Sequence, residues 1–217
     1  LLSYQVDGLI ITPVVLHVNT DHIKLLNETN KPFVTIWDIP GIKTHYVKYN
    51  DIQAGYLATE YLLQMGHRNI IYLSGPETDT SIVDRAKGFK RCLKEHKKPF
   101  HNGMIAHTKW TANEAFEDSI QLLSSLKTRP TAIMCYDDTA AMGVYRAAHK
   151  LDIRIPDDLS IIGFNDIPLA AMMGPPLTTI HIPTYEIGRK AASMLLEQIN
   201  GRPQRGFNQK MFNPKLI

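Results

Sequence analysis

The sequence contains little cysteine and no long apolar run. Only Cys92 and Cys135 occur among the 217 residues, far apart and both in apolar surroundings. This usage favours a reduced, cytoplasmic protein without a disulfide framework. No stretch approaches the roughly 20 apolar residues that a membrane helix needs. The first residues, Leu1–Gln5, lack a methionine and a signal-peptide pattern. They are typical of the middle of a helix, so we expect the chain to begin partway through a longer protein.

A strong excess of one charge is also absent. The chain has 24 Lys and Arg against 21 Asp and Glu, a net charge of +3. This balance does not indicate a nucleic-acid surface on this chain by itself. The lysine-rich run from Lys87 to Lys98 alternates with apolar residues at helical spacing. A solvated helix face therefore explains this run better than a nucleic-acid patch does.

Signatures of metal and cofactor chemistry are missing as well. The nine histidines show no HxH, HxxH or HxxxH spacing, so a histidine-rich metal site is not supported. The sequence contains no Walker A, GxGxxG, GxSxG or CxxC motif. No motif therefore supports a hydrolase, a nucleotidase or a dinucleotide enzyme, and no cofactor is predicted.

Short apolar runs bounded by turn residues alternate with amphipathic stretches at helical spacing almost throughout the chain. The predicted strands are Gly8–Thr12, Phe33–Trp37, His45–Tyr49, Ile70–Ser74, Met104–Thr108, Thr131–Tyr136 and Leu159–Phe164. The predicted helices are Asp51–Met65, Asp84–Lys97, Ala112–Leu126, Ala140–Leu151 and Tyr185–Ile199. This alternation predicts an α/β fold of parallel sheets covered by helices on both faces, because parallel strands need crossovers of about that length. The chain can form one large domain or two small lobes.

Polar residues follow three of the predicted strands at the point where each strand ends. Asp38 follows "FVTIW", Asp137 and Asp138 follow "TAIMCY", and Asn165 and Asp166 follow "SIIGF". Parallel sheets of this class bind ligands at the carboxyl ends of their strands. We therefore expect these side chains to belong to one shared ligand site.

The adjacent polar pairs allow several kinds of chemistry. Neighbouring side chains of an extended strand point to opposite faces, so neither pair chelates one ion without a turn. Glycosidases use two carboxylates that face each other across a sugar, and the sequence leaves that arrangement open. The stretch "DDTAAMGVYRAA" is typical of a capped helix start. We expect one aspartate of this pair to cap the helix and the other to face the ligand.

Two further residues are predicted at the same edge of a sheet. Arg85 opens the predicted helix after "NIIYLSG", and Trp110 follows another strand in "AHTKW". Arg85 is either an ordinary solvated arginine or a donor of paired hydrogen bonds to vicinal hydroxyls or to an anion. Trp110 is either a half-buried packing residue or an apolar platform for a sugar or a planar base. Carboxylates, an amide, an arginine and an aromatic plate together are typical of a saccharide-binding site.

A series of phrases in a fixed order covers nearly the whole chain. It runs from "VDGLIITP" through "NDIQAGYLATEYLLQMGHRNIIYLSGP" and "DRAKGFKRCL". It continues with "RPTAIMCYDDTAAMGVYRAAHKLDIRIPDDLSIIGFNDIPLAAMMGPPLTTIHIP" and "IGRKAASMLLEQINGR". Through these phrases the chain resembles the effector-binding core of the LacI/GalR family of transcriptional regulators. The resemblance implies a periplasmic-binding-protein-like fold of two Rossmann-like lobes joined by three crossovers. It implies lobes formed by 1–50 with 182–202 and by 51–181 with 203–217, and it places the first strand and part of the first helix outside this chain.

The resemblance also implies which residues contact the effector and which form a homodimer. The implied effector contacts are Asp38, Ser81, Arg85, Trp110, Asp137, Asn165 and Tyr185. Many family members have aspartate at the position of Asn165, so this amide can alter ligand choice. The implied interface comprises Met142, Leu169, Met172 and Met173, whereas the alternative for the last three is ordinary packing under the sheet.

Three functions follow as hypotheses. The first is a sugar-responsive DNA-binding repressor, in which this chain is the effector-binding and dimerisation core. Its helix-turn-helix domain is then expected upstream of Leu1. The second is a solute-binding protein of a sugar transporter, and the third is an enzyme that acts on a sugar through its paired carboxylates. The sequence favours the first.

Overall fold

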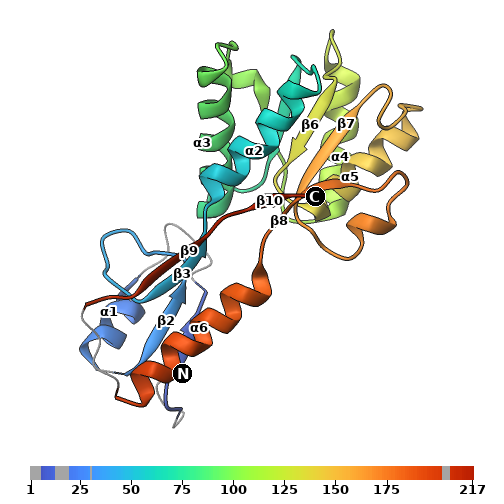
Figure 1. The fold of residues 1–217 in the computed structure, drawn as a ribbon. Coiled ribbons are helices and arrows are strands. Elements are labelled where there is room, and N and C mark those ends of the chain that lie inside the picture. Colours follow the sequence, from blue (N-terminus) through green and yellow to red (C-terminus); the bar gives the residue numbers. More distant parts are fainter. Residues whose placement is uncertain (1–5, 13–19, 30, 202–205) are drawn as a thin grey trace. The chain divides into compact units, whose positions relative to one another are not determined.

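The computed structural model describes residues 6–12, 20–29, 31–201 and 206–217, which form two compact units (Figure 1). The predicted helical character of Leu1–Gln5 lies outside these residues. The first unit reaches Asn50 and resumes from Pro183 to Asn213, and the second comprises Asp51–Ile182 with Pro214–Ile217. The chain therefore passes between the units three times, as the resemblance implied.

The first unit is built on a small parallel sheet. Its strands are β1 (Leu9–Ile11), β2 (Phe33–Ile36), β3 (Tyr46–Tyr49) and β9 (Gln209–Phe212), paired in that order. Helix α1 (Asp21–Glu28) packs Ile23 and Leu26 against Phe33, while α6 (Thr184–Ile199) packs on the strands from the other side (Figure 1). Residues 33 and 34 are both buried because successive strand side chains point to opposite, helix-covered faces.

The placement of residues 206–213 corrects the expected division of the chain. We assigned 203–217 to the second lobe, but β9 pairs in parallel with β3 from Tyr46↔Gln209 to Tyr49↔Phe212. The described residues from Gly206 to Asn213 therefore belong to the first unit. Only β10 (Lys215–Leu216) joins the second sheet, where it pairs antiparallel with β8.

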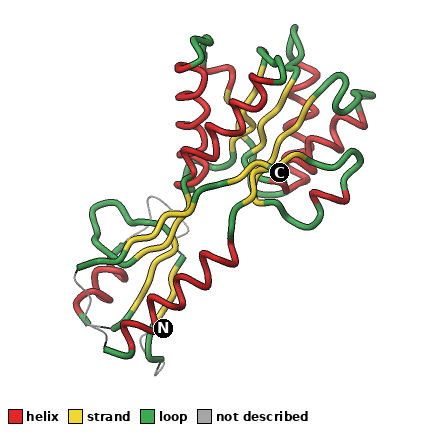
Figure 2. The backbone as a smooth tube through the Cα atoms, viewed as in Figure 1, coloured by secondary structure: helices red, strands yellow, loops and turns green. Residues whose placement is uncertain are grey.

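The second unit is a doubly covered sheet of six strands. The strand order is β10-β8-β7-β6-β4-β5, parallel except for β10, and Figure 2 shows the two sheets as separate groups of strands. The parallel strands are β4 (Ile70–Ser74), β5 (Ile105–His107), β6 (Ala132–Cys135), β7 (Ser160–Asn165) and β8 (Thr178–His181). Every residue of β4 and β6 is buried, as expected for strands covered on both faces.

Four helices cover this sheet in two pairs. One pair is α2 (Asp51–Gln64) with α3 (Thr80–Glu95), and the other is α4 (Ala112–Ser125) with α5 (Asp138–Lys150). Gly55 and Gly88 allow α2 and α3 to touch, because a Cβ on Gly55 would lie 2.1 Å from the Arg85 carbonyl oxygen. Two short 3-10 turns, Asn102–Met104 and Ala170–Met172, complete the unit.

The predicted strands and helices are all present, with two differences of consequence. Helix α3 begins at Thr80 rather than at Asp84, because the Asp79 carboxylate accepts the Ser81 N–H and caps the helix there. Arg85 therefore lies in the second turn and does not open the helix. The predicted set of strands and helices also did not include α1, β8, β9 and β10.

Candidate functional site

The carboxyl ends of four neighbouring strands form one edge of the second sheet. Strands β5, β4, β6 and β7 are adjacent and parallel, so they all end on the same side. The structure brings five predicted residues to these strand ends or to the segments that follow them: Ser81, Arg85, Trp110, Asp137 and Asn165. We call this group the carboxyl-edge site.

Arg85 is a buried residue of this site, and the solvated alternative is wrong. Only 3% of Arg85 is exposed, and its Nε donates to Asp51 Oδ1 at 3.0 Å. Its Nη1 donates to the Tyr136 carbonyl oxygen, and its guanidinium carbon lies 4.6 Å from the centre of the Phe164 ring. One side chain therefore connects the start of α2 with the ends of β6 and β7.

The two aspartates after β6 have separate structural tasks. Asp137 caps α5, because its Oδ1 accepts the Ala140 N–H at 2.7 Å, as predicted for one member of the pair. It is partly exposed; burial raises the pKa of its carboxyl group, which the hydrogen bond from Ala140 and the charge of Arg85 oppose.

Asp138 does not face a ligand, so the expectation for the second member of the pair is wrong. It is fully buried and accepts hydrogen bonds from the Thr179 hydroxyl at 2.7 Å and from the Ile167 N–H at 2.9 Å. Burial raises the pKa of this carboxyl group to about 6, although both hydrogen bonds lower it.

The pair after β7 is divided in the same manner. Asp166 accepts a hydrogen bond from, or ion-pairs with, His181 Nδ1 at 2.8 Å. Asn165 ends β7 and is partly exposed, and its side chain makes no hydrogen bond to the other described residues. Their φ angles are 106° and 56°, in the region that asparagine and aspartate tolerate better than most residues.

Trp110 and Ser81 occupy the loops that follow β5 and β4. Trp110 is 49% exposed, and its ring meets Tyr136 edge-on with 6.1 Å between the ring centres. The half-buried packing alternative therefore fits this position, and the accessible part of the indole is also compatible with a platform for a ligand. The Ser81 hydroxyl is buried and donates to Asp79 Oδ1 at 2.5 Å, so it is already used within the helix cap.

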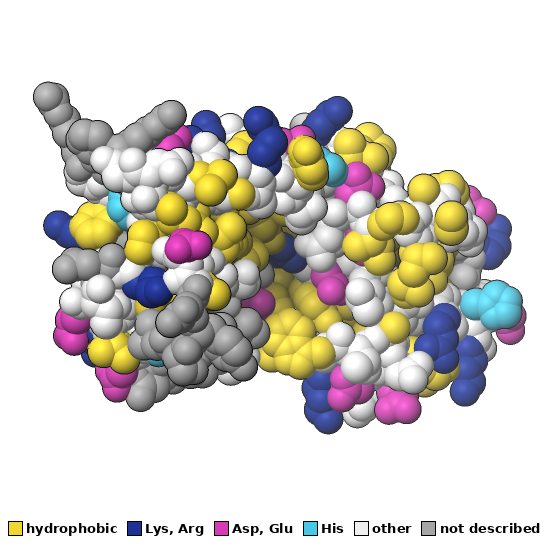
Figure 3. Space-filling model, turned by 90° about the horizontal axis from the view of Figure 1, so that it is seen from below, with side chains coloured by type: hydrophobic (Ala, Val, Ile, Leu, Met, Phe, Trp, Pro, Cys, Tyr) yellow, Lys and Arg dark blue, Asp and Glu magenta, His cyan; other side chains and the backbone are white. Residues whose placement is uncertain are grey.

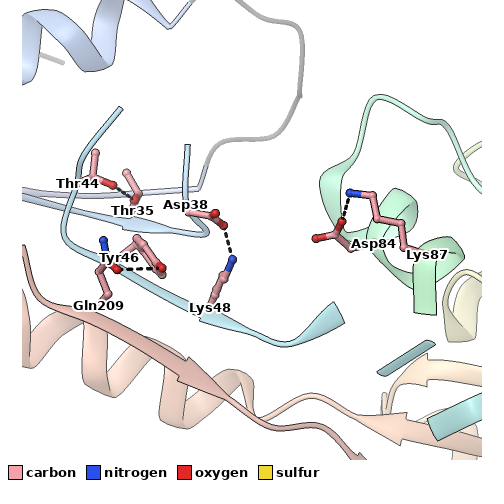
Figure 4. Close-up of polar contacts among 8 residues, drawn as sticks. All are labelled: Thr35, Asp38, Thr44, Tyr46, Lys48, Asp84, Lys87 and Gln209. Carbon is pink, nitrogen blue, oxygen red and sulfur yellow. Dashed lines mark hydrogen bonds and ion pairs between the residues drawn. The ribbon is translucent and has the colours of Figure 1, made fainter. Parts of the chain in front are cut away.

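The remaining two predicted contacts lie in the first unit. Asp38 follows β2 and forms an ion pair of 2.7 Å with Lys48 of β3, as Figure 4 shows. Tyr185, in the first turn of α6, is 77% exposed. Lys48 was missed by the sequence reading because its partner Asp38 lies ten residues earlier, in the segment that follows the neighbouring strand β2. Asp51 was missed because its partner lies 34 residues later in the chain.

The residues expected at a subunit interface lie on or next to the surface of the second unit. Leu169 is 50% exposed and Met172 is 78% exposed, which excludes packing under the sheet for these two side chains. Met142 and Met173 are partly exposed. We call the stretch from Leu169 to Met173 the apolar segment.

One groove of the second unit contains none of the predicted residues. It has a volume of about 430 Å³ and lies by the amino ends of β7 and β8, where Ser160 and Thr178 begin these strands. Tyr61, Met65 and Tyr145 form part of its wall. The chemistry predicted from the sequence is at the opposite ends of the strands.

Figure 3 shows basic and acidic side chains interspersed on the face that it draws. The described residues contain no group of three His, Cys, Asp or Glu side chains that could hold a metal ion. None of the described helices has the length and apolar character needed to cross a bilayer.

Comparisons with known proteins agree with the fold. A family model described as a periplasmic binding protein-like domain matches residues 59–217. An HTH-type transcriptional repressor PurR from Vibrio atlanticus is 39% identical over 153 residues, or 70% of this chain and 46% of its own length. The chain thus spans about half the length of this curated relative.

Two solved structures extend the similarity over almost the whole chain. A regulatory protein of the LacI family from Chloroflexus aggregans has a TM-score of 0.89 and 31% identity, covering 98% of this chain and 75% of that one. A LacI family transcriptional regulator from Enterococcus faecium, solved with bound ribose, has a TM-score of 0.86 and 28% identity. That match covers 98% of this chain and 78% of the regulator. These relatives are transcriptional regulators and not enzymes.

Proposed function

This chain belongs to the LacI family of transcriptional regulators, and we propose that it is the effector-binding and dimerisation core of a sugar-responsive DNA-binding repressor. The observation that carries the proposal is the composition of the carboxyl-edge site. It combines a buried, ion-paired Arg85 with the accessible indole of Trp110 and the Asn165 amide. Such groups bind vicinal hydroxyls and the C–H face of a sugar ring.

Selectivity in such a site comes from polar groups that a wrong ligand leaves unpaired. Asp137 retains partial exposure beside the charge of Arg85, so its carboxylate is suited to accept a hydroxyl hydrogen. The ribose bound to the Enterococcus faecium regulator supports a sugar as the ligand class. Ser81 of the second unit, and Asp38 and Tyr185 of the first, are proposed contacts that follow from the family resemblance.

The proposed regulation is a two-state mechanism. An effector stabilises the conformational state of the protein that it binds more tightly, and only to the extent of that difference in affinity. We further propose that a homodimer, with Met142 and the apolar segment at its interface, transmits this change to operator DNA. The DNA is bound by a helix-turn-helix domain of the full-length protein. Such a repressor acts in the cytoplasm.

A thermal-shift panel tests the proposed ligand class. We expect a monosaccharide, a disaccharide or a sugar phosphate to raise the melting temperature, and purines enter the panel because a planar base can also stack on Trp110. A ligand at 100 times its Kd stabilises by about 2.7 kcal/mol. Trp110→Ala should reduce the shift, whereas Met65→Ala, which truncates another exposed side chain of the second unit, should retain it. A panel without any stabilising ligand, or equal shifts in both variants, contradicts the proposal.

A further inference from the structure

The carboxylate of Asp138 connects three segments of the second unit that are distant in the sequence. Asp138 is the first residue of α5. Its carboxylate accepts hydrogen bonds from the Thr179 hydroxyl of β8 and from the Ile167 N–H of the loop after β7. A Cβ on Gly163 would lie 2.2 Å from Asp138 Oδ1, so the carboxylate also packs directly against the β7 backbone. Three contacts from three elements hold this group in one position.

Asp138 and Thr179, which we call the anchor, form hydrogen bonds with the turn that carries Asn165. Ile167 comes two residues after Asn165, and Asp166 N–H makes a longer bond of 3.4 Å to the same Thr179 hydroxyl. The two consecutive positive φ angles at Asn165 and Asp166 cost free energy and persist only where the surroundings impose them. Asp138 and Thr179 supply that constraint because they accept hydrogen bonds from the Ile167 and Asp166 N–H groups.

The same anchor leads into the apolar segment. The Ala170 N–H donates to the Ile167 carbonyl at 2.9 Å, and the Leu177 N–H donates to the Ala170 carbonyl at 3.0 Å. Ala170 is buried, while its neighbours Leu169 and Met172 are exposed. Ile167, whose N–H donates to Asp138, is therefore linked through its own carbonyl oxygen and one hydrogen bond to Ala170 of the apolar segment.

We propose that Asp138, with Thr179, is a positioning residue of the effector site that sets the direction of the Asn165 amide and couples it to the apolar segment. This inference rests on the proposed function, because it assigns the turn to effector binding. Asp138 itself is fully buried and does not touch the ligand. Its effect on binding passes through the Asn165–Ile167 backbone.

Substitutions of Thr179 test the anchor with little change in volume. Thr179→Val removes the hydroxyl that donates a hydrogen bond to Asp138, whereas Thr179→Ser retains a hydroxyl at this position. Thr59→Val is the matched control, because Thr59 is also a fully buried threonine of the second unit, but its hydroxyl donates to Gly55 within α2. Asp138→Asn is a second probe, since an amide has one acceptor oxygen and cannot accept from the Ile167 N–H and the Thr179 hydroxyl through two separate oxygens.

Hydrogen exchange of the complete chain without ligand is the first measurement. We expect Thr179→Val and Asp138→Asn to accelerate exchange of the Ile167 amide about tenfold or more, with smaller increases at Ala170 and Met172. Thr179→Ser and Thr59→Val should leave these amides near wild-type rates. Equal exchange at Ile167 in Thr179→Val and Thr59→Val would overturn the anchor.

Calorimetric titration with ribose is the second measurement and separates positioning from the proposed function. We expect Thr179→Val to weaken ribose binding about tenfold, and Thr179→Ser and Thr59→Val to stay within about twofold of wild type. Equal affinities in Thr179→Val and Thr59→Val would overturn the positioning role even if exchange changes. Absence of ribose binding by the wild type would count against ribose as the effector, while the exchange pattern still decides whether the turn is anchored.

Discussion

Arg85 Nε lies 3.0 Å from Asp51 Oδ1, and both side chains are buried almost completely. Asp51 is the first residue of the second unit after the chain leaves the first, and Arg85 also contacts the ends of β6 and β7. This ion pair therefore joins the beginning of one unit to the carboxyl-edge site of the same unit.

Breaking this pair should destabilise the protein strongly. Asp51→Asn or Arg85→Ala removes one charge of a buried ion pair, which typically costs about 3–5 kcal/mol. Denaturant titrations of both variants and of the double variant measure the coupling. Arg91→Ala is the control, because Arg91 forms an exposed pair with Glu95, and its unfolding free energy should stay close to wild type. Equal effects at Arg85 and Arg91 would show that the buried pair has no special role.

Asn165 should influence which ligand is preferred. An amide donates and accepts hydrogen bonds, whereas an ionised carboxylate only accepts them. Asn165→Asp is therefore expected to change the ratio of affinities for two panel ligands about tenfold or more, measured by calorimetric titration. Asn102→Asp makes the same change at an exposed residue before the amino end of β5 and should leave the ratio unchanged. An unchanged ratio in both variants removes Asn165 from the site.

Stability should depend on pH through Asp138. Its folded-state pKa of about 6 lies above the ordinary value of 3.8 because the group is buried. The folded state thus favours the protonated form, so the contribution is fully present below about pH 4 and is lost as the pH rises through about 6. We expect the unfolding free energy of the wild type to fall by about 2 kcal/mol relative to that of Asp138→Asn over this range. This value is smaller than the full conversion of the pKa shift because solvent screens part of the interaction.

Neighbouring groups must be controlled in that pH series. Asp137 precedes Asp138, and the pair of Asp166 and His181 lies beside the Thr179 hydroxyl. Denaturant titrations from pH 4 to 7 should be repeated with His181→Gln in both backgrounds. If the difference between wild type and Asp138→Asn is constant over this range, Asp138 does not titrate there.

The apolar segment should support self-association. Met172 is 78% exposed, and a glutamate there places a charge where an apolar contact is expected. Met172→Glu should weaken dimerisation at least 100-fold in sedimentation experiments without changing monomer stability. Met65→Glu, at a similarly exposed methionine outside the segment, should leave the dimer intact. A Met172→Glu chain that remains dimeric excludes this surface from the interface.

Local pattern predicted seven of the strands, most helix bounds and the strand ends that form the carboxyl-edge site. Capping by Asp137 was predictable because the signal is local, with Ala140 three residues away. The burial of Asp138 was not, because Thr179 is 41 residues distant. The burial of Arg85 likewise depends on Asp51, and the pairing of β9 with β3 joins segments more than 160 residues apart. Contacts of such separation leave no periodic signature in the sequence.

The most direct test of the account is an NMR titration of the labelled chain with the strongest ligand of the panel. Assigned resonances of the Trp110 indole N–H, the Asn165 side-chain amide and the backbone of Asp137 should shift together and saturate at one Kd. Shifts confined to Tyr61, Met65 and Tyr145 would place the ligand in the groove at the amino ends of the strands. That result, with the carboxyl-edge resonances unchanged, would contradict the proposed effector site.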